Sequence, residues 1–153
     1  MVGRCLGIDF GERRIGLAIS DERGRVAVPL AVLERRDDAT AVREIGELAE
    51  RERVARIVVG DPIRVDGSTG EAALRARSFG GKLAQATGLP VEMIPETLTS
   101  VEAEHRLPGM RRSARRGVVD ALAAQILLQE ALDRRDDMAA GSQQARPHSG
   151  GQG

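Results

Sequence analysis

Three acidic residues stand among apolar neighbours in this sequence. Asp9 lies inside one apolar run, Glu96 comes shortly after a second, and Asp120 lies inside a third that is rich in alanine and leucine. Carboxylates at such core positions are costly unless they are paired, hydrogen-bonded or bound to cations. Together they indicate a metal site.

Carboxylate oxygens suit Mg²⁺ or Mn²⁺, which are hard cations. Two such ions roughly 4 Å apart can clamp the attacking water and the leaving oxygen of a phosphodiester. The chain lacks the Cys/His pairs that a zinc site needs. The chemistry expected at Asp9, Glu96 and Asp120 is therefore phosphodiester hydrolysis, with these residues as both metal ligands and catalytic groups and without a covalent intermediate.

An arginine cluster precedes the run that holds Asp120. Guanidinium groups match the geometry of phosphate oxygens. On this reading the nucleic-acid-binding residues are Arg14, Arg111, Arg112, Arg115 and Arg116. The alternative for the cluster is a solvated charged face in an arginine-rich chain.

The first part of the chain predicts three antiparallel strands. Residues 4–10 and 15–20 are apolar runs separated by a turn, which is a hairpin pattern. Residues 26–33 form a third run, and Pro29 places it at a sheet edge because proline cannot donate a ladder hydrogen bond. A helix then runs from about residue 38 to about residue 53, with apolar residues at helical spacing.

The second part alternates strands and helices. The remaining elements are expected at residues 55–59 (strand), from the capping-box signature at 68–71 to about 86 (helix), 91–94 (strand), from 99 (short helix) and 113–134 (helix). Such alternation favours parallel strands joined by right-handed crossovers. The fold class predicted is α/β: a five-stranded mixed sheet flanked by helices, with the first three strands antiparallel and the last two parallel to the first.

Side-chain periodicity orients two of the acids. Strand alternation places Gly7 and Asp9 on one face of the first strand. In the last helix, Asp120 shares a face with Ala123 and Ala124, which are small enough to let that face approach the sheet. Glu96 follows a strand that this topology can place near the first strand. The three carboxylates are therefore expected to gather at one end of the sheet.

Composition restricts the alternatives. Hydrophobic residues make up 41% of the chain and aromatic residues 1%, so the core is aliphatic and no aromatic platform for stacking bases is available. The formal net charge is 0, so nucleic-acid binding must depend on local charge. The lone Cys5 excludes an internal disulfide and fits a reducing cytoplasm.

The domain organisation expected is one nuclease domain at residues 1–137 and a disordered tail at residues 138–153, where glycine, serine and glutamine dominate the end of the chain. No apolar run approaches the roughly 18 residues of a membrane span, and no signal sequence is recognisable. A cytoplasmic protein without membrane contact is expected.

Four motifs resemble the YqgF/RuvX family. They are residues 6–11 with 14–18, residues 58–62 with 66–67, residues 96–100, and residues 116–124. The resemblance covers residues 4–134 in unbroken order. It implies a ribonuclease H-like fold and an activity described either as Holliday junction resolution or as maturation of the 5′ end of pre-16S ribosomal RNA. By resemblance, Asp9, Glu96 and Asp120 occupy the family's acidic catalytic positions.

Three positions depart from the family pattern. Pro95 replaces an acidic residue before Glu96, and Thr97 replaces an arginine after it. Asp61 replaces an apolar residue after Gly60. A structural role is the favoured interpretation of Asp61, and a further carboxylate near the site is the alternative.

The function predicted is a nuclease dependent on two Mg²⁺ or Mn²⁺ ions, acting as a monomer or homodimer on precursor ribosomal RNA. The alternatives are a Holliday junction resolvase acting on branched DNA and a non-catalytic nucleic-acid-binding factor. A sugar-kinase or actin-like ATPase is a weaker alternative, because the chain is too short for two lobes. His105 is interpreted as a surface residue of an amphipathic helix.

Overall fold

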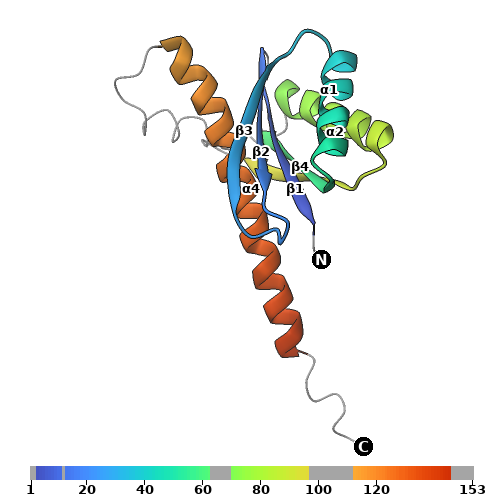
Figure 1. Cartoon of the computed structure of the whole chain (residues 1–153), viewed down its shortest axis with the longest axis vertical. Helices are drawn as coiled ribbons and strands as arrows, with labels where there is room; N and C mark the ends of the chain where they lie inside the picture. Colours follow the sequence, from blue (N-terminus) through green and yellow to red (C-terminus); the bar gives the residue numbers. More distant parts are fainter. Residues whose placement is uncertain (1–2, 12, 63–69, 97–111, 146–153) are drawn as a thin grey trace, which may run out of the picture.

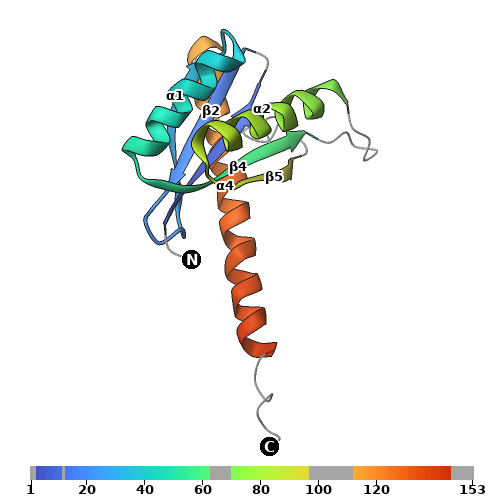
Figure 2. The same cartoon turned by 90° about the vertical axis from the view of Figure 1, so that its right-hand side faces the viewer.

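The computed structural model describes residues 3–11, 13–62, 70–96 and 112–145. Its elements are β1 (Arg4–Phe10), β2 (Arg14–Ser20), β3 (Ala27–Glu34), α1 (Asp38–Arg51), β4 (Val54–Pro62), α2 (Glu71–Thr87), β5 (Val91–Glu96) and α4 (Arg112–Ala145). Figure 1 shows α1 and α2 on one side of the sheet and α4 on the other. In the turned view of Figure 2, α4 continues well beyond the sheet.

The sheet has the strand order β3-β2-β1-β4-β5. Strand β1 pairs antiparallel with β2 and parallel with β4, β2 pairs antiparallel with β3, and β4 pairs parallel with β5. The predicted mixed five-stranded sheet is confirmed. Because β1, β4 and β5 run in the same direction, their carboxyl ends meet at one end of the sheet.

Two apolar cores cover the two faces of the sheet. The core under α1 and α2 holds the larger side chains, including Leu6, Ile8 and Phe79. The rings of Phe10 and Phe79 stack there with centroids 4.5 Å apart. The core under α4 is built from smaller residues such as Ala18 and Ala124. This asymmetry lets α4 lie close to the sheet.

Glycines on neighbouring strands allow this close approach. A Cβ atom added at Gly7 would lie 2.8 Å from the Cβ of Leu128, and one added at Gly16 would overlap the backbone oxygen of Asp120. Ala123 and Ala124 on the facing side of α4 are fully buried. The predicted sheet-facing side of the last helix is therefore confirmed, and the sheet positions opposite it have to be small.

Helix ends follow local chemistry where it is described. Asp37 caps α1, because its side chain accepts a hydrogen bond of 2.7 Å from the backbone N–H of Thr40. Helix α2 begins after Gly70 without a side-chain cap and ends at Gly88, which has a φ of 71°. Residues 68 and 69 of the predicted capping box lie outside the described residues, and so does the short helix predicted from residue 99.

Helix α4 is longer than predicted. It was expected at residues 113–134 but extends from Arg112 to Ala145, past the predicted domain boundary at 137. The apolar periodicity stops near residue 134, yet residues 135–145 contain three alanines and two glutamines, which favour helix and offset the cost of about 1 kcal/mol at Gly141. Residues 146–153 are outside the described part. Among the described helices, none is both long and apolar enough to cross a membrane.

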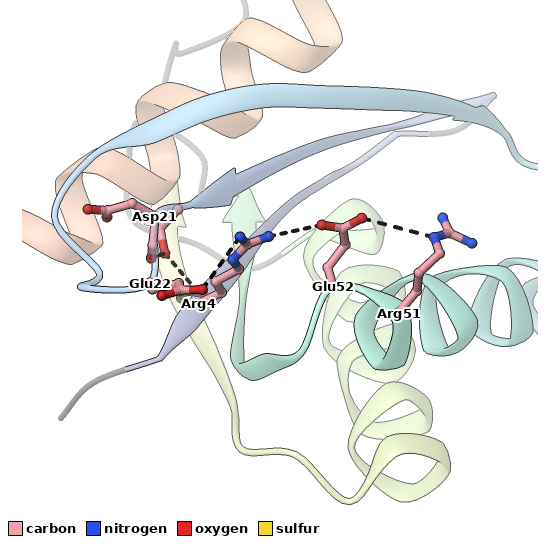
Figure 3. A network of polar contacts seen from close by, with 7 residues as sticks. Arg4, Asp21, Glu22, Arg51 and Glu52 are labelled. Carbon is pink, nitrogen blue, oxygen red and sulfur yellow. Dashed lines mark hydrogen bonds and ion pairs between the residues drawn. The ribbon is translucent and has the colours of Figure 1, made fainter.

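An ion-pair network ties together the opposite end of the sheet from the three acids. Figure 3 shows Arg4, at the start of β1, between Glu22 of the β2–β3 turn and Glu52 at the end of α1. The Arg4 guanidinium lies 3.0 Å from Glu52 Oε1 and 3.9 Å from Glu22 Oε1, and Arg51 approaches Glu52 at 4.0 Å. These partly exposed pairs stabilise the fold only modestly.

Two glutamines of α4 bind the outer edge of the sheet. The backbone N–H of Ala27, at the start of β3, donates a 2.9 Å hydrogen bond to Gln129 Oε1. The Ala27 carbonyl accepts a 3.0 Å hydrogen bond from Gln125 Nε2. Side chains thus satisfy the first peptide groups of an edge strand, two residues before Pro29, which confirms the predicted edge position.

Replacing Gly16 by alanine tests the close approach of α4. The added methyl group would collide with the Asp120 backbone, so we expect Gly16→Ala to destabilise the fold by about 1–3 kcal/mol, as overpacking does. The matched control is Gly81→Ala, where nothing lies within 4 Å of the added atom and helix propensity favours alanine. Thermal denaturation of both variants measures the difference. An unchanged melting temperature for Gly16→Ala would contradict the proposed packing.

Candidate active site

Asp9 and Glu96 form a hydrogen-bonded pair at the carboxyl end of the sheet. Asp9 lies near the end of β1, Glu96 is the last residue of β5, and their side chains are hydrogen-bonded to one another. Strand β4 separates the two strands. The pair is thus formed across an intervening strand.

Gly60 on β4 makes room for this pair. A Cβ atom at Gly60 would overlap Glu96 Oε2 and lie 3.3 Å from Leu127 Cδ2. The Glu96 carboxyl group therefore occupies the space that a side chain on the middle strand would fill. This role of Gly60 was not predicted from the sequence. The available signal was a glycine in an otherwise apolar strand, which often marks a close approach.

Asp120 reaches the same end of the sheet from α4. Its backbone oxygen lies against Gly16 of β2. Its carboxylate accepts a hydrogen bond of 2.7 Å from Arg14 Nε, and both side chains are partly exposed, at 24% for Asp120 and 32% for Arg14. The charge of Asp120 also acts on Asp9. The three predicted acids therefore lie in one neighbourhood, and Arg14 holds one of them.

Burial and mutual repulsion change the acidities of the pair. Burial raises the pKa of Asp9 to about 6; the hydrogen bond with Glu96 opposes this shift, and the charge of Asp120 adds to it. Burial raises the pKa of Glu96 to about 9, and the negative charge of Asp9 and the hydrogen bond to it act in the same direction. Because both pKa values are raised, the pair favours holding one proton between its two carboxyl groups.

Asp9 and Glu96 offer oxygen atoms of the kind that a divalent cation prefers. Glu96 Oε1 is buried without a hydrogen-bond partner, which is costly for a polar atom unless another group binds it. Carboxylate oxygens are the preferred ligands of Mg²⁺ and Mn²⁺. Across the described ranges, however, no group of three His, Cys, Asp or Glu side chains is gathered closely enough to hold one ion. The pair is preassembled, whereas Asp120 would have to exchange Arg14 for a cation.

Asp61 lies on the other face of the sheet. Its buried carboxylate accepts hydrogen bonds of 3.1 and 2.9 Å at Oδ2 from the Nε and Nη2 of Arg77 on α2. Gly60, the preceding residue, faces α4, so strand alternation turns Asp61 towards α2. The structural role favoured for Asp61 is confirmed, because its side chain joins β4 to α2. The alternative, a further carboxylate near the site, is wrong.

Most of the predicted phosphate-binding cluster cannot be placed. Arg111 lies outside the described residues, and so do Thr97 and His105. Arg112, Arg115 and Arg116 belong to the first turns of α4, where only the backbone is described. Their contacts with phosphate stay a prediction.

The raised pKa of Glu96 makes stability depend on pH. Its pKa is about 9 in the folded chain against 4.5 ordinarily, so its contribution is fully present below about pH 4.5 and is lost as the pH rises towards 9. Glu96→Gln cannot ionise. We expect this variant to match the wild type near pH 4.5 and to melt progressively higher than it up to pH 9, by at least about 3 °C or 1 kcal/mol.

Melting curves between pH 4.5 and 9 with a chelator present measure this difference. The control is Glu34→Gln, an exposed glutamate at the end of β3. A constant difference between Glu96→Gln and wild type across the whole pH range would contradict the assigned acidity.

Comparison with known proteins identifies named relatives of this chain. A protein from Anaeromyxobacter sp. (strain K), named as a candidate pre-16S rRNA nuclease, is 47% identical over 134 residues, which are 86% of this chain and 98% of the relative. A protein of the same name from Crocosphaera subtropica is 40% identical over 133 residues, covering 86% of this chain and 93% of the relative.

Solved structures support the fold. RuvC from Thermus thermophilus, in complex with a Holliday junction substrate, superposes with a TM-score of 0.54 at 18% identity, covering 88% of this chain and 96% of that one. The fold is therefore ribonuclease H-like. The family model described as RuvX, Holliday junction resolvase, matches residues 3–134. This chain belongs to the RuvX family.

Proposed function

We propose that this protein is a divalent-cation-dependent nuclease that hydrolyses phosphodiester bonds, with Asp9, Glu96 and Asp120 as its catalytic metal ligands. The observation that carries the proposal is the Asp9–Glu96 pair. Two carboxyl groups are brought together across a strand, one oxygen is buried without a partner, and a third carboxylate stands nearby. A purely structural role explains neither the crowding nor the orphaned oxygen.

Each side chain has a separate task in this proposal. Asp9 and Glu96 provide a rigid pair of ligands, because both sit at the ends of paired strands and Glu96 fills the space over Gly60. To hold a cation, Glu96 would have to lose its proton. Bound Mg²⁺ or Mn²⁺, as two ions, supplies Lewis-acid activation of water and stabilisation of the departing oxygen. Asp120 completes the ligand set from α4.

Precursor ribosomal RNA is the preferred substrate. Relatives at 40–47% identity are named for pre-16S rRNA, whereas the likeness to RuvC at 18% identity supports the fold alone. Processing of the 5′ end of pre-16S rRNA is therefore the proposed role, and it places the protein in the cytoplasm. Holliday junction DNA is the second candidate, because the matching family model is described by that activity.

A side-by-side cleavage assay tests both activity and substrate. The purified protein with Mn²⁺ receives a pre-16S rRNA fragment and a four-way DNA junction at equal concentrations. We expect cleavage of the RNA, and we expect Asp9→Asn, Glu96→Gln and Asp120→Asn each to lower its rate by at least about 100-fold, since each removes a ligand of the proposed cations.

The matched control for this assay is Glu34→Gln, which should cleave at the wild-type rate. Cleavage of the junction alone would transfer the proposal to DNA. A wild-type rate in any of the three variants would remove that residue from the site.

Arg14 links the carboxylates to the substrate in this proposal. Its guanidinium neutralises Asp120 in the cation-free chain. In this proposal the Arg14–Asp120 ion pair would separate when substrate and metal bind. Asp120 would then bind a cation, and Arg14 would bind a phosphate. Arg14 would then act as a counter-ion that competes with the metal before it contacts the nucleic acid. The cluster Arg111, Arg112, Arg115 and Arg116 is proposed to hold the backbone further along.

Replacing Arg14 separates these two actions. Without nucleic acid, we expect Arg14→Gln to bind Mn²⁺ more tightly than the wild type, because Asp120 loses its competitor, while its affinity for substrate falls. Calorimetric titration with Mn²⁺ measures the first effect. The control is Arg43→Gln, an exposed arginine on α1. Weaker Mn²⁺ binding in Arg14→Gln would instead show that Arg14 positions Asp120.

A further inference from the structure

A cavity lies at the opposite end of the sheet from the three acids. It has a volume of about 610 Å³. Its walls come from the amino-terminal parts of β1 and β4, the β2–β3 turn, β5, and α4 at residues 131–136. In both Figure 1 and Figure 2 this is the region where α4 leaves the sheet. At 1.5 Å per residue, Arg135 is about 22 Å from Asp120 along the helix axis, so the cavity is separate from the candidate active site.

The floor of this cavity is apolar and uncharged. Ile94, Ala131 and Leu132 line it, and each is nearly inaccessible to solvent. Cys5 lies beside them, and burial raises the pKa of its thiol to about 12, with Arg56 and Glu92 acting in opposite directions. The thiol therefore stays neutral. The surface that these residues turn to the cavity is apolar and carries no charge that would bind an isolated ion.

The rim of the cavity is positively charged. Four arginines line it, against only two carboxylates: Arg23, Arg56, Arg134 and Arg135 against Glu92 and Asp136. Arg135 donates a hydrogen bond of 3.0 Å to Glu92, which neutralises one pair. Arg23 and Arg134 are exposed, so their guanidinium groups are accessible to a ligand. The charge balance of the rim favours an anion.

We propose that this cavity binds a nucleoside phosphate, with the phosphate on Arg23 and Arg134 and the base against the apolar floor. Arginine forks match phosphate oxygens, and guanidinium planes also stack on bases, so the rim serves a nucleotide even though the cavity has no aromatic residue. The volume is in the ordinary range for a small-molecule site. The choice of a nucleotide among organic anions rests on the proposed nuclease function.

Two sources could supply this chemistry: a free nucleotide, or an unpaired nucleotide of a strand bound elsewhere on the protein. The binding measurement uses full-length protein with a chelator present, so that it is independent of cleavage. Adenosine 5′-monophosphate, adenosine and inorganic phosphate are titrated separately by calorimetry. We expect the monophosphate to bind more tightly than either part. Equal affinity for phosphate alone, or for adenosine alone, would overturn the proposal.

Variants then locate the binding site. Arg23→Gln and Arg134→Gln should each weaken binding of the monophosphate by roughly tenfold, the effect of losing one charge-assisted hydrogen bond. Arg43→Gln, which lies outside the cavity, should not change it. Asp9→Asn should also bind normally, which separates failure of this site from failure of the proposed active site. Wild-type affinity in both cavity variants would overturn the assignment, since both residues are exposed and the fold should tolerate their replacement.

A competition experiment with Asp9→Asn distinguishes the two sources. If a short single-stranded RNA displaces the monophosphate, the cavity holds a nucleotide of the bound strand; if the RNA binds without displacing it, the cavity serves a free nucleotide. Either result supports a nucleotide site. Displacement by an acidic peptide at lower concentration than the RNA or monophosphate requires would overturn it in favour of a protein partner.

Discussion

The short distance between α4 and the sheet is the constraint on which the rest of the structure depends. Gly7 and Gly16 have no side chain on the face of the sheet that contacts the helix. On the helix side, the buried residues Ala123 and Ala124 are also small. A larger residue at these positions would move the helix outward and take Asp120 away from the strand ends. The small-residue core on this face is therefore a requirement for bringing together acids that lie far apart in the sequence.

The negative charge of the three acids near α4 is reduced by a proton and by an arginine side chain. A proton shared by Asp9 and Glu96 removes one negative charge, and the guanidinium of Arg14 offsets that of Asp120. On the opposite face, two nitrogens of Arg77 hold the buried Asp61. Asp61 thus joins β4 to α2, whereas metal binding by the carboxylates on the α4 side is part of the proposed function.

Periodicity in the sequence was enough to predict much of this arrangement. Alternation in β1 and helical spacing around Asp120 correctly assigned the faces of both elements, because burial imposes those periods directly. Gly60 was different: its role depends on Glu96 reaching across a neighbouring strand, which no local pattern encodes. The partner of Asp61, Arg77, lies 16 residues further on in α2, and no local pattern encodes that pairing either. Helix α4 was predicted too short because helix propensity continues where apolar periodicity ends.

The glutamine contacts at Ala27 affect how two copies of this chain could assemble. An open sheet edge is a template on which another chain can add a strand. Here the peptide group at the start of β3 is already bound to Gln125 and Gln129, and Pro29 lacks a donor just beyond it. Strand addition along this part of β3 would have to break two hydrogen bonds, and Pro29 could not donate one to the added strand. A homodimer formed by this chain would therefore use a surface other than a continuous intermolecular sheet through this edge.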